Sequence, residues 1–201
     1  MYRVIVLCIG YLLGGIQTAV LYGRVKGIDI RQHGSGNAGA TNTLRVLGKK
    51  AGFIVFVGDV LKAALAVLIA KLIFQEHSYL AGLYAGIGAI LGHSYPLFFK
   101  FKGGKGIAVS VGAIYFIDLR IGLIASIIFI LCASFTKIVS ISSMLLTWFI
   151  PIGIVLFERG ETYFLEALGL GCVIGALTTY RHKENIKRLL NGTESKLGQK
   201  K

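Results

Sequence analysis

Long runs of apolar residues dominate the sequence, and short polar segments separate them. A helix needs roughly 20 mostly apolar residues to cross the ~30 Å hydrocarbon core of a bilayer. Seven runs are predicted to be transmembrane segments, at residues 4–23, 51–74, 78–99, 107–117, 121–136, 138–157 and 162–180. The pattern therefore predicts an all-α, polytopic membrane helix bundle, which we expect to form a single domain over residues 1–201.

The fourth of these runs is the shortest. As a helix, residues 107–117 rise only about 17 Å. We therefore expect this segment to be short, extended into its loops or shielded by other parts of the protein. If residues 107–117 and 121–136 are counted as two segments, the number of spans is odd. The basic C-terminal tail then lies on the same side of the membrane as the other basic segments.

Composition supports the membrane assignment. The chain is 55% hydrophobic and only 15% charged, with a mean hydropathy of +0.72 and a net charge of +13. A soluble domain carries about 25% charged residues, and disordered chains lack this much apolar material. The composition therefore excludes both a soluble single-domain protein and a disordered chain.

Basic residues predict the orientation. They gather in the segments at residues 24–50 and 96–106, at Lys137 and in the tail at residues 181–201, whereas the opposite segments hold only Arg3, Arg120 and Arg159. Lys and Arg favour the cytoplasmic side of a membrane. The N-terminus is therefore predicted to lie outside and the C-terminus in the cytoplasm. Residues 4–23 resemble a signal peptide, but its removal would place the basic segment that follows outside, so they are interpreted as a span.

Few polar groups interrupt the predicted spans. Asp59 and Lys62 are three residues apart on one helix, so they are predicted either to pair structurally or to act as a functional intramembrane site. The three cysteines lie singly in apolar runs without a zinc-binding spacing, which predicts buried, unpaired thiols.

The first long cytoplasmic segment contains the glycine-rich sequence GSGNAGATN at residues 34–42, followed by Arg45. Successive backbone N–H groups of such a loop form an anion-binding nest, and an arginine adds a planar fork suited to phosphate oxygens. A flexible linker is the alternative, but a linker needs neither two asparagines nor the arginine. Phosphate binding is the favoured interpretation.

The second cytoplasmic segment ends in GGKG at residues 103–106, just before a predicted helix. It is not a Walker A loop, because neither the earlier glycine nor the following Ser or Thr is present. Contact with lipid headgroups explains Lys100 and Lys102, but not a lysine flanked by glycines. A glycine-flanked Lys105 at a helix N-terminus predicts a second anion site.

These loops resemble motifs of a known family. SGNAGATN at residues 35–42, GHSYP through FKGGKG at residues 92–106, and RHKENIKRL with NGTE at residues 181–194 are similar to the three motifs of the bacterial membrane-bound acyl-phosphate:glycerol-3-phosphate acyltransferases, the PlsY family. The similarity covers nearly the whole chain. It implies acyl transfer from acyl phosphate to the 1-hydroxyl of sn-glycerol 3-phosphate in the bacterial inner membrane, the first committed step of phospholipid synthesis. It also implies a soluble phosphate acyltransferase as the partner that makes the donor. No cofactor or metal is expected, because the sequence shows no metal-binding cluster.

The residues and the resemblance together define a candidate site. The residues predicted to bind substrate phosphate are Ser35, Gly36, Asn37, Gly39, Thr41, Asn42, Arg45, His93, Gly103, Gly104, Lys105 and Gly106. The residues predicted as catalytic are His182, Asn185 and Ser142, and Arg188 and Glu194 are expected to have structural or minor roles.

The chemistry of the candidate site leaves alternatives open. A serine near residue 142 is either a helix cap or a ligand donor. His182 either acts as a base or, as we expect, orients glycerol 3-phosphate while a donor phosphate oxygen takes the proton. No covalent acyl-enzyme is expected, because acyl phosphate already carries a good leaving group. The competing function is a small carrier for phosphate-bearing anions, but a carrier predicts more polar residues within the spans than Asp59, Lys62 and Glu166.

Overall fold

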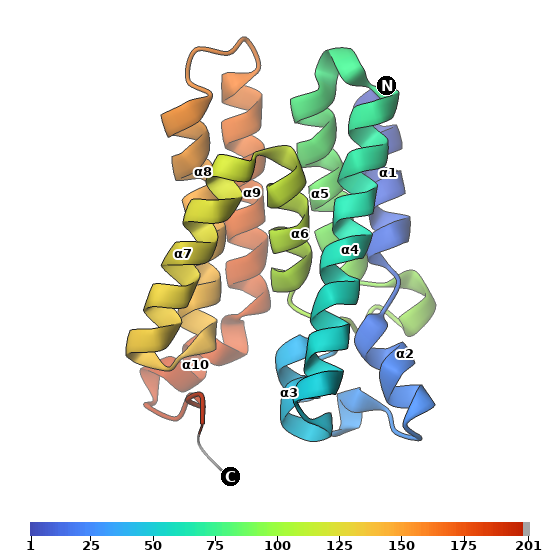
Figure 1. The fold of residues 1–201 in the computed structure, drawn as a ribbon, viewed down its shortest axis with the longest axis vertical. Helices are drawn as coiled ribbons and strands as arrows, with labels where there is room; N and C mark the ends of the chain where they lie inside the picture. Colours follow the sequence, from blue (N-terminus) through green and yellow to red (C-terminus); the bar gives the residue numbers. More distant parts are fainter. Residues whose placement is uncertain (199–201) are drawn as a thin grey trace. The chain divides into compact units, whose positions relative to one another are not determined.

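The computed structural model describes residues 1–198, and over that range it contains helices and no strand (Figure 1). Every predicted apolar segment is helical, the first of them as two helices. The elements are α1 Tyr2–Gly14, α2 Thr18–Val25, η1 Ile30–Gln32, α3 Ala40–Leu47, α4 Lys49–Ile73, η2 Gln75–His77, α5 Ser78–Ser94, η3 Leu97–Phe99, α6 Ile107–Ile117, α7 Leu119–Thr136, α8 Val139–Phe157, α9 Phe164–Arg181 and α10 Lys183–Leu190, where η marks a short 3-10 helix.

The chain divides into two compact units. Unit 1 is Met1–Ile117, with α1 to α6, and unit 2 begins at Asp118 and holds α7 to α10. A single domain over residues 1–201 stays a prediction. Residues 199–201 of the predicted cytoplasmic tail lie outside the described residues.

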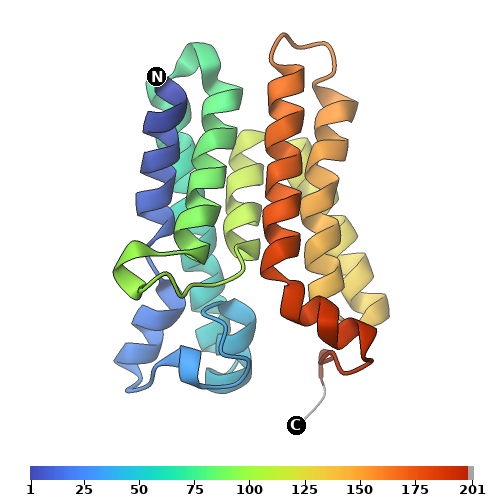
Figure 2. The ribbon, with the colours of Figure 1, turned by 180° about the vertical axis from the view of Figure 1, so that it is seen from behind.

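Close helix packing in unit 1 depends on glycines that face one another. A side chain at Gly10 or Gly14 of α1 would overlap the backbone of α5, and one at Gly88 or Gly92 of α5 would overlap the backbone of α1. The two helices consequently run side by side (Figure 2). Small residues spaced four apart let membrane helices approach closely and gain van der Waals contact.

The first apolar run is not the single helix that its pattern predicts. α1 ends at Gly14, and α2 begins at Thr18 after a break. The carbonyl oxygen of Ile16 in the break accepts a hydrogen bond of 2.5 Å from Lys62 Nζ, and the buried side chain of Gln17 donates one of 3.1 Å to the carbonyl oxygen of His93. Tertiary partners thus satisfy backbone groups that a continuous helix would have paired internally.

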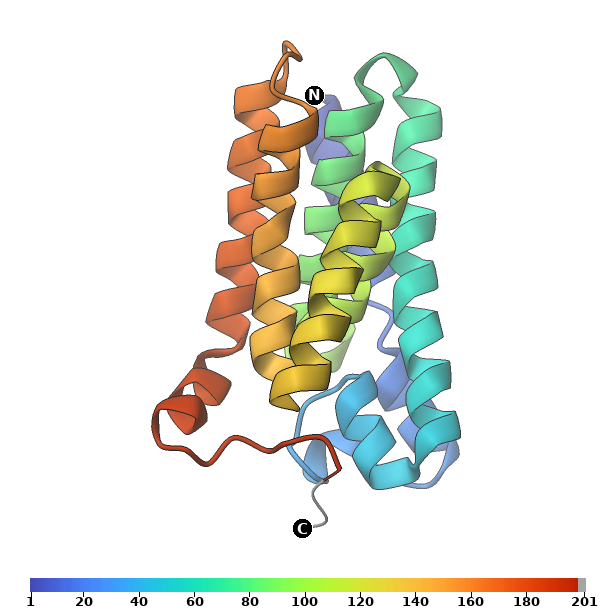
Figure 3. The ribbon, with the colours of Figure 1, turned by 60° about the vertical axis from the view of Figure 1, so that its left-hand side comes forward.

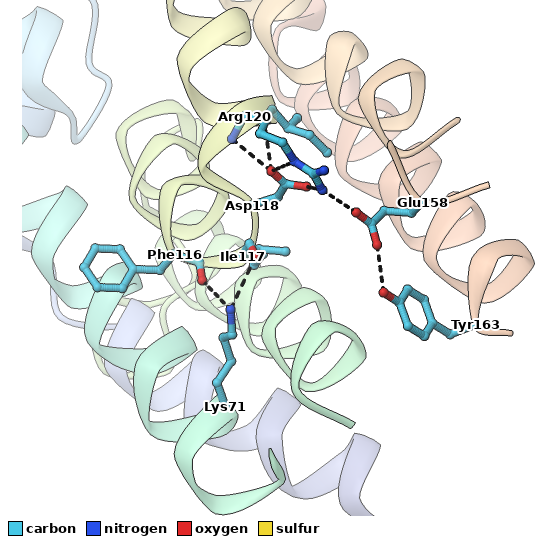
Figure 4. A network of polar contacts seen from close by, with 8 residues as sticks. Lys71, Phe116, Ile117, Asp118, Arg120, Glu158 and Tyr163 are labelled. Atoms are coloured by element: carbon cyan, nitrogen blue, oxygen red, sulfur yellow. Dashed lines mark hydrogen bonds and ion pairs between the residues drawn. The ribbon is translucent and has the colours of Figure 1, made fainter. Parts of the chain in front are cut away.

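α6 has the short length expected for the fourth segment, and unit 1 shields one side of it. Val109, Gly112 and Ile114 are among its buried residues, and Gly112 packs directly on the α4 backbone at Val60. At its C-terminal end, Lys71 Nζ donates to the carbonyl oxygen of Phe116 at 2.9 Å (Figure 4). A cation at the carbonyl end of a helix is favourable, so Lys71 stabilises α6 where it stops.

Unit 2 is built on α7, α8 and α9. α8 packs against both of the other helices through glycines: Gly153 contacts Ile121 of α7, while Gly171 and Gly175 of α9 contact Pro151 and Trp148 of α8. α10 then turns away from the axis of α9 and leads into an extended tail (Figure 3).

Charged groups close one end of unit 2. Asp118 caps α7 by accepting from the backbone N–H of Arg120 at 2.9 Å, and the Arg120 side chain bridges Asp118 and Glu158 at 2.7 and 2.6 Å (Figure 4). Glu158 also accepts a hydrogen bond of 2.7 Å from the Tyr163 hydroxyl. These contacts tie the beginning of α7 to the loop between α8 and α9.

Four helical segments of the described chain are long and apolar enough to cross a membrane, namely Tyr2–Val25, Lys49–Ile73, Leu119–Thr136 and Val139–Phe157. The expectation of seven spans stays a prediction. The prediction of buried cysteines is confirmed for none of the three: Cys8 and Cys172 are exposed on apolar helices, and Cys132 is only half-buried. In a helix that is apolar on all sides, the sequence pattern does not show whether a cysteine faces other helices or lies on the outer face.

Candidate active site

The first glycine-rich loop leads into the N-terminal turn of α3. Ser35 and Gly36 are exposed, Asn37 is half-buried, and Gly39 is buried as the N-cap residue. Thr41 and Asn42 lie in the first turn of α3, and Arg45 is exposed in its last turn. The loop therefore places small residues at the backbone N–H end of a helix, which is the geometry of an anion site.

Asn42 organises this loop from within. Its side-chain N–H₂ group donates to the carbonyl oxygens of Ile30 and His33 at 3.1 and 3.0 Å, and its Oδ1 accepts from the backbone N–H and hydroxyl of Ser35 at 2.8 and 3.1 Å. Gly34 has a φ of +60° and packs on the same amide, where a side chain would collide. Asn42 is 1% exposed, so the structure shows it holding the loop's shape.

The second glycine-rich loop packs directly on His93. The backbone N–H of Gly104 donates to the carbonyl oxygen of His93 at 3.1 Å. A side chain at Gly103 would overlap that carbonyl, and one at Gly104 would overlap both the His93 ring and the carbonyl oxygen of Ala38. Because Ala38 belongs to the first loop, the two glycine-rich loops lie against each other within unit 1.

Lys105 is half-buried directly after these two glycines, and Gly106 leads into α6 with a φ of +85°. Lys100 and Phe101 precede them with φ values of +57°, a conformation that non-glycine residues seldom adopt. The carbonyl oxygen of Pro96 holds this turn by accepting from the N–H of Phe101 at 3.0 Å. The segment is thus fixed by backbone contacts up to the glycines.

A tether between the two loops was not apparent from the sequence. Arg31 binds Asp29 through both carboxylate oxygens, with a closest distance of 2.7 Å, and donates to the carbonyl oxygen of Phe99 at 3.2 Å. The hydrogen bonds from the Arg31 side chain lower the pKa of Asp29 to about 2. The only sequence signal is an acid and a base two residues apart, which is common on protein surfaces.

His93 is buried beside the ion pair of α4 and is 3% exposed. Asp59 and Lys62 pair at 2.8 Å, so their predicted structural pairing is present. Lys62 Nζ also lies 2.9 Å from Nδ1 of His93, and Thr18 donates to Asp59 at 3.1 Å. The structure therefore places His93 between the ion pair and the second glycine-rich loop.

Unit 2 carries the three predicted catalytic residues. His182 lies at the junction of α9 and α10 and is 3% exposed. Its Nδ1 is 2.8 Å from the carbonyl oxygen of Thr178, so in the hydrogen bond the ring N–H donates. In a neutral ring, Nε2 then carries the lone pair and can accept a proton.

Asn185, Arg188 and Glu194 form one network in unit 2. The carboxylate of Glu194 accepts hydrogen bonds from Asn185 Nδ2, Arg188 Nε and Ser140 Oγ at 2.5, 2.7 and 2.8 Å. Burial raises the pKa of Glu194, but the hydrogen bonds from Asn185, Arg188 and Ser140 outweigh it and leave this pKa below its usual range. The predicted structural roles of Arg188 and Glu194 fit this network, which ties the tail to α8 and α10.

Ser142 is fully buried in the first turns of α8, and its hydroxyl donates to the carbonyl oxygen of Ile138 at 3.0 Å. The helix cap predicted for a serine here is absent, because the N-cap residue is Ile138, which has no polar side chain, and the hydroxyls of Ser142 and Ser143 donate to carbonyl oxygens one turn earlier.

A largely apolar groove of about 290 Å³ runs beside the first loop, between α3 and α4. Its lining consists of Ala40, Thr41, Leu44, Lys49, Gly52, Phe53 and Phe56. Over residues 1–198, no group of three or more His, Cys, Asp or Glu side chains is arranged to hold a metal ion.

Comparisons with known proteins cover nearly the whole chain. A family model described as glycerol-3-phosphate acyltransferase matches residues 4–192. The glycerol-3-phosphate acyltransferases of Thermoanaerobacter sp. (strain X514) and Clostridioides difficile (strain 630) are 44% and 42% identical to the chain; the alignments cover 100% and 98% of this chain and 98% and 97% of the relatives.

Two solved structures are also similar. They are crystal structures of PlsY, an integral membrane glycerol 3-phosphate acyltransferase, in a glycerol 3-phosphate form and a lysophosphatidic acid form. Each is 38% identical to the chain and covers 98% of it and 96% of the PlsY chain, with TM-scores of 0.88 and 0.84.

Proposed function

Because the chain belongs to the glycerol-3-phosphate acyltransferase family and is an acyltransferase, we propose that it uses acyl phosphate as the acyl donor. The acceptor is the 1-hydroxyl of sn-glycerol 3-phosphate, and the products are lysophosphatidic acid and inorganic phosphate. The observation that carries this proposal is the full-length similarity to PlsY structures in glycerol 3-phosphate and lysophosphatidic acid forms.

The proposed reaction exchanges one C–O bond for another. The 1-hydroxyl oxygen forms a bond to the acyl carbonyl carbon, and the bond between that carbon and the phosphate oxygen breaks. The hydroxyl proton goes to His182 Nε2 or to an oxygen of the departing phosphate. Because phosphate is already a good leaving group, positioning and charge stabilisation suffice, and no acyl-enzyme forms.

Unit 1 is proposed to bind phosphate groups. Arg45 and Lys105 supply positive charge, while the loops at residues 35–42 and 103–106 supply backbone donors at close approach. The groove between α3 and α4 gives an apolar surface next to Thr41 for the acyl chain. Asn42 and His93 contribute by holding the loops in shape, since their side chains are bound within unit 1.

Unit 2 is proposed to supply His182 for the chemical step. Thr178 orients its ring through Nδ1, and Nε2 is the nitrogen proposed to take part in the reaction. Asn185 is proposed to act with His182, although Asn185 Nδ2 also binds Glu194. Ser142 could donate to substrate only after its single hydroxyl proton leaves the carbonyl oxygen of Ile138.

The enzyme is proposed to lie in the bacterial inner membrane with seven spans, its N-terminus outside and its active site at the cytoplasmic face. The clustering of basic residues in the segments that hold the loops supports this orientation. Thiol labelling of single cysteines introduced at Ser35 and Glu76, in a cysteine-free protein, tests it: a membrane-impermeant reagent added to intact cells should label position 76 and not position 35.

The decisive test supplies the purified protein, in lipid nanodiscs, with acyl phosphate and glycerol 3-phosphate. We expect equal amounts of phosphate and lysophosphatidic acid, and no product from acyl-CoA or acyl carrier protein. A soluble phosphate acyltransferase is the proposed source of the donor, so adding it should replace added acyl phosphate. Movement of glycerol 3-phosphate across vesicle membranes without any acyl product would instead identify a carrier.

A further inference from the structure

The ammonium group of Lys62, in the middle of α4, is surrounded by three acceptors. Its Nζ lies 2.8 Å from Oδ1 of Asp59, 2.5 Å from the carbonyl oxygen of Ile16 and 2.9 Å from Nδ1 of His93. A lysine ammonium has three N–H donors and no lone pair. The three acceptors therefore use each donor once, and the buried pair of opposite charges is both neutralised and hydrogen-bonded.

This arrangement determines where His93 carries its proton. Because the ammonium can only donate, Nδ1 of His93 must accept. A neutral imidazole that accepts at Nδ1 has its proton on Nε2. Asp59 Oδ1 lies 3.7 Å from Nδ1, which is too far for a hydrogen bond, so the carboxylate is not a direct acceptor for a proton on that nitrogen.

The other side of His93 supports the second glycine-rich loop. Its carbonyl oxygen accepts from the N–H of Gly104 and from Gln17 Nε2, both at 3.1 Å. Its Nε2 lies where a side chain at Gly104 would collide, directly before Lys105. The position of His93 is thus transmitted to the backbone that precedes this lysine.

We propose that Asp59 and Lys62 are positioning residues for acyl transfer: they hold His93 in its Nε2-protonated tautomer and so fix the loop that presents Lys105. The proposal rests on the proposed function for its effect on turnover, whereas the tautomer itself can be measured without any substrate. Neither residue needs to touch the substrate, because both act through His93.

The first measurement is the ¹⁵N spectrum of the full-length protein in nanodiscs, with histidine labelled in its ring. Protonated and unprotonated ring nitrogens have distinct shifts, and His93→Gln identifies the signals of His93. We expect the proton on Nε2 in the wild type. A proton on Nδ1 would overturn the proposal, whether or not the protein proves to be an acyltransferase.

The second measurement is kinetic and uses the double variant Asp59→Asn with Lys62→Met, which removes both charges at similar volume. We expect the His93 tautomer preference to be lost and kcat/KM to fall roughly ten- to a hundred-fold, by analogy with the loss of a partner that orients a metal-binding histidine. Lys71→Met is the matched control, because Lys71 also lies in α4 but binds carbonyl groups at the C-terminal end of α6.

The control variant should keep wild-type kcat/KM. Wild-type kcat/KM in the double variant would overturn the proposal. If the double variant does not insert into the membrane, the wild-type spectrum alone decides between the two tautomers. A wild-type protein that does not acylate glycerol 3-phosphate would contradict the proposed function and leave the spectrum to test the role of Lys62.

Discussion

Two buried histidines, one in each unit, show how a neighbouring group decides what an imidazole can do. His93 ends α5 and His182 follows α9, and each is 3% exposed. In both rings Nδ1 is engaged, but by Lys62 Nζ in unit 1 and by the carbonyl oxygen of Thr178 in unit 2. Nδ1 therefore accepts in His93 and donates in His182, which leaves a proton on Nε2 of the first neutral ring and a lone pair on Nε2 of the second.

The difference teaches that burial and residue type do not define a catalytic histidine. His93 is suited to support a loop, whereas His182 can accept a proton. On sequence grounds we expected His182 to orient glycerol 3-phosphate as a donor. Its hydrogen bond to Thr178 means that Nε2 donates only when the ring is charged, so the geometry favours the base.

The largest expected effect separates the two histidines directly. A glutamine keeps a donor near the position of Nε2 but cannot act as a base, so His182→Gln should lower kcat by about 10²–10⁴-fold. The matched variant His93→Gln should cost less, about tenfold, because its amide can accept from Lys62 and still place an N–H group near the position of Nε2. Steady-state kinetics with acyl phosphate measure both, and equal losses would contradict the assignment.

The pH profile sharpens the same contrast. A histidine base must be neutral to work, so wild-type kcat should fall as the pH drops through its pKa, and that acid limb should be absent from the residual activity of His182→Gln. A limb that persists in the variant would assign the proton to a donor phosphate oxygen instead.

The next largest effect tests the phosphate role of unit 1. Arg45→Ala and Lys105→Ala should each lose about 1.5–3 kcal/mol of a charge-assisted contact, equivalent to roughly a ten- to hundred-fold loss of kcat/KM. Lys102→Ala is the control, because Lys102 is exposed in the same loop and has a glycine on one side only, whereas Lys105 is half-buried between two glycines. Near-normal kinetics for Arg45→Ala and Lys105→Ala would remove both residues from the site.

A smaller effect should follow from the Glu194 network of unit 2. Because the folded pKa of Glu194 lies below its usual value of 4.5, its stabilisation is fully present above that value and is lost as the pH falls through the folded pKa. A spin label on Ser195→Cys, in a cysteine-free protein, should become mobile over that range. Glu194→Gln should be mobile already at neutral pH and lower activity roughly fivefold, an effect of about 1 kcal/mol.

The control for this network is Glu184→Gln. Glu184 is exposed on α10 and pairs with Lys187 at 3.5 Å, and surface pairs of this kind contribute little. Label mobility equal to wild type is expected for this variant. Equal mobility in Glu194→Gln would show that the three hydrogen bonds to the carboxylate do not hold the tail.

The smallest expected effect is no effect at all. Neither unit is expected to use a cysteine nucleophile, so the triple variant Cys8→Ala, Cys132→Ala, Cys172→Ala should keep wild-type activity. Intact-protein mass spectrometry after incubation with acyl phosphate alone should show no added acyl mass. A stable acylated protein that donates its acyl group to glycerol 3-phosphate would refute direct transfer.

The apolar pattern predicts the helices well because each helix needs a long apolar surface that contacts either other helices or lipid. All seven predicted segments are helical, and the pairing of Asp59 with Lys62 follows from spacing on one helix. The break at residues 15–17 was not predicted, because it depends on partners distant in sequence. The carbonyl oxygen of Ile16 is bound by Lys62. Gln17 lies in an apolar run, and the sequence does not show that its side chain binds the carbonyl oxygen of His93.

For the candidate site, the sequence predicts which segments matter better than what each side chain does. Asn42 belongs to a loop with an anion-binding pattern, yet its amide is used by Ile30, His33 and Ser35. Composition shows that donors are present but cannot show that they are already engaged. The contact between the two glycine-rich loops likewise appears only in three dimensions, where Gly104 meets Ala38.

The ion pair of α4 also bears on how the protein is made. A lone lysine or aspartate at the centre of a membrane helix costs about 2.5–3.5 kcal/mol during insertion by the translocon. Asp59 and Lys62 are three residues apart, so they can neutralise each other within α4 alone, before α5 and His93 pack against it. The same two charges that are proposed to orient a histidine in the folded protein would therefore also lower the cost of inserting their own helix.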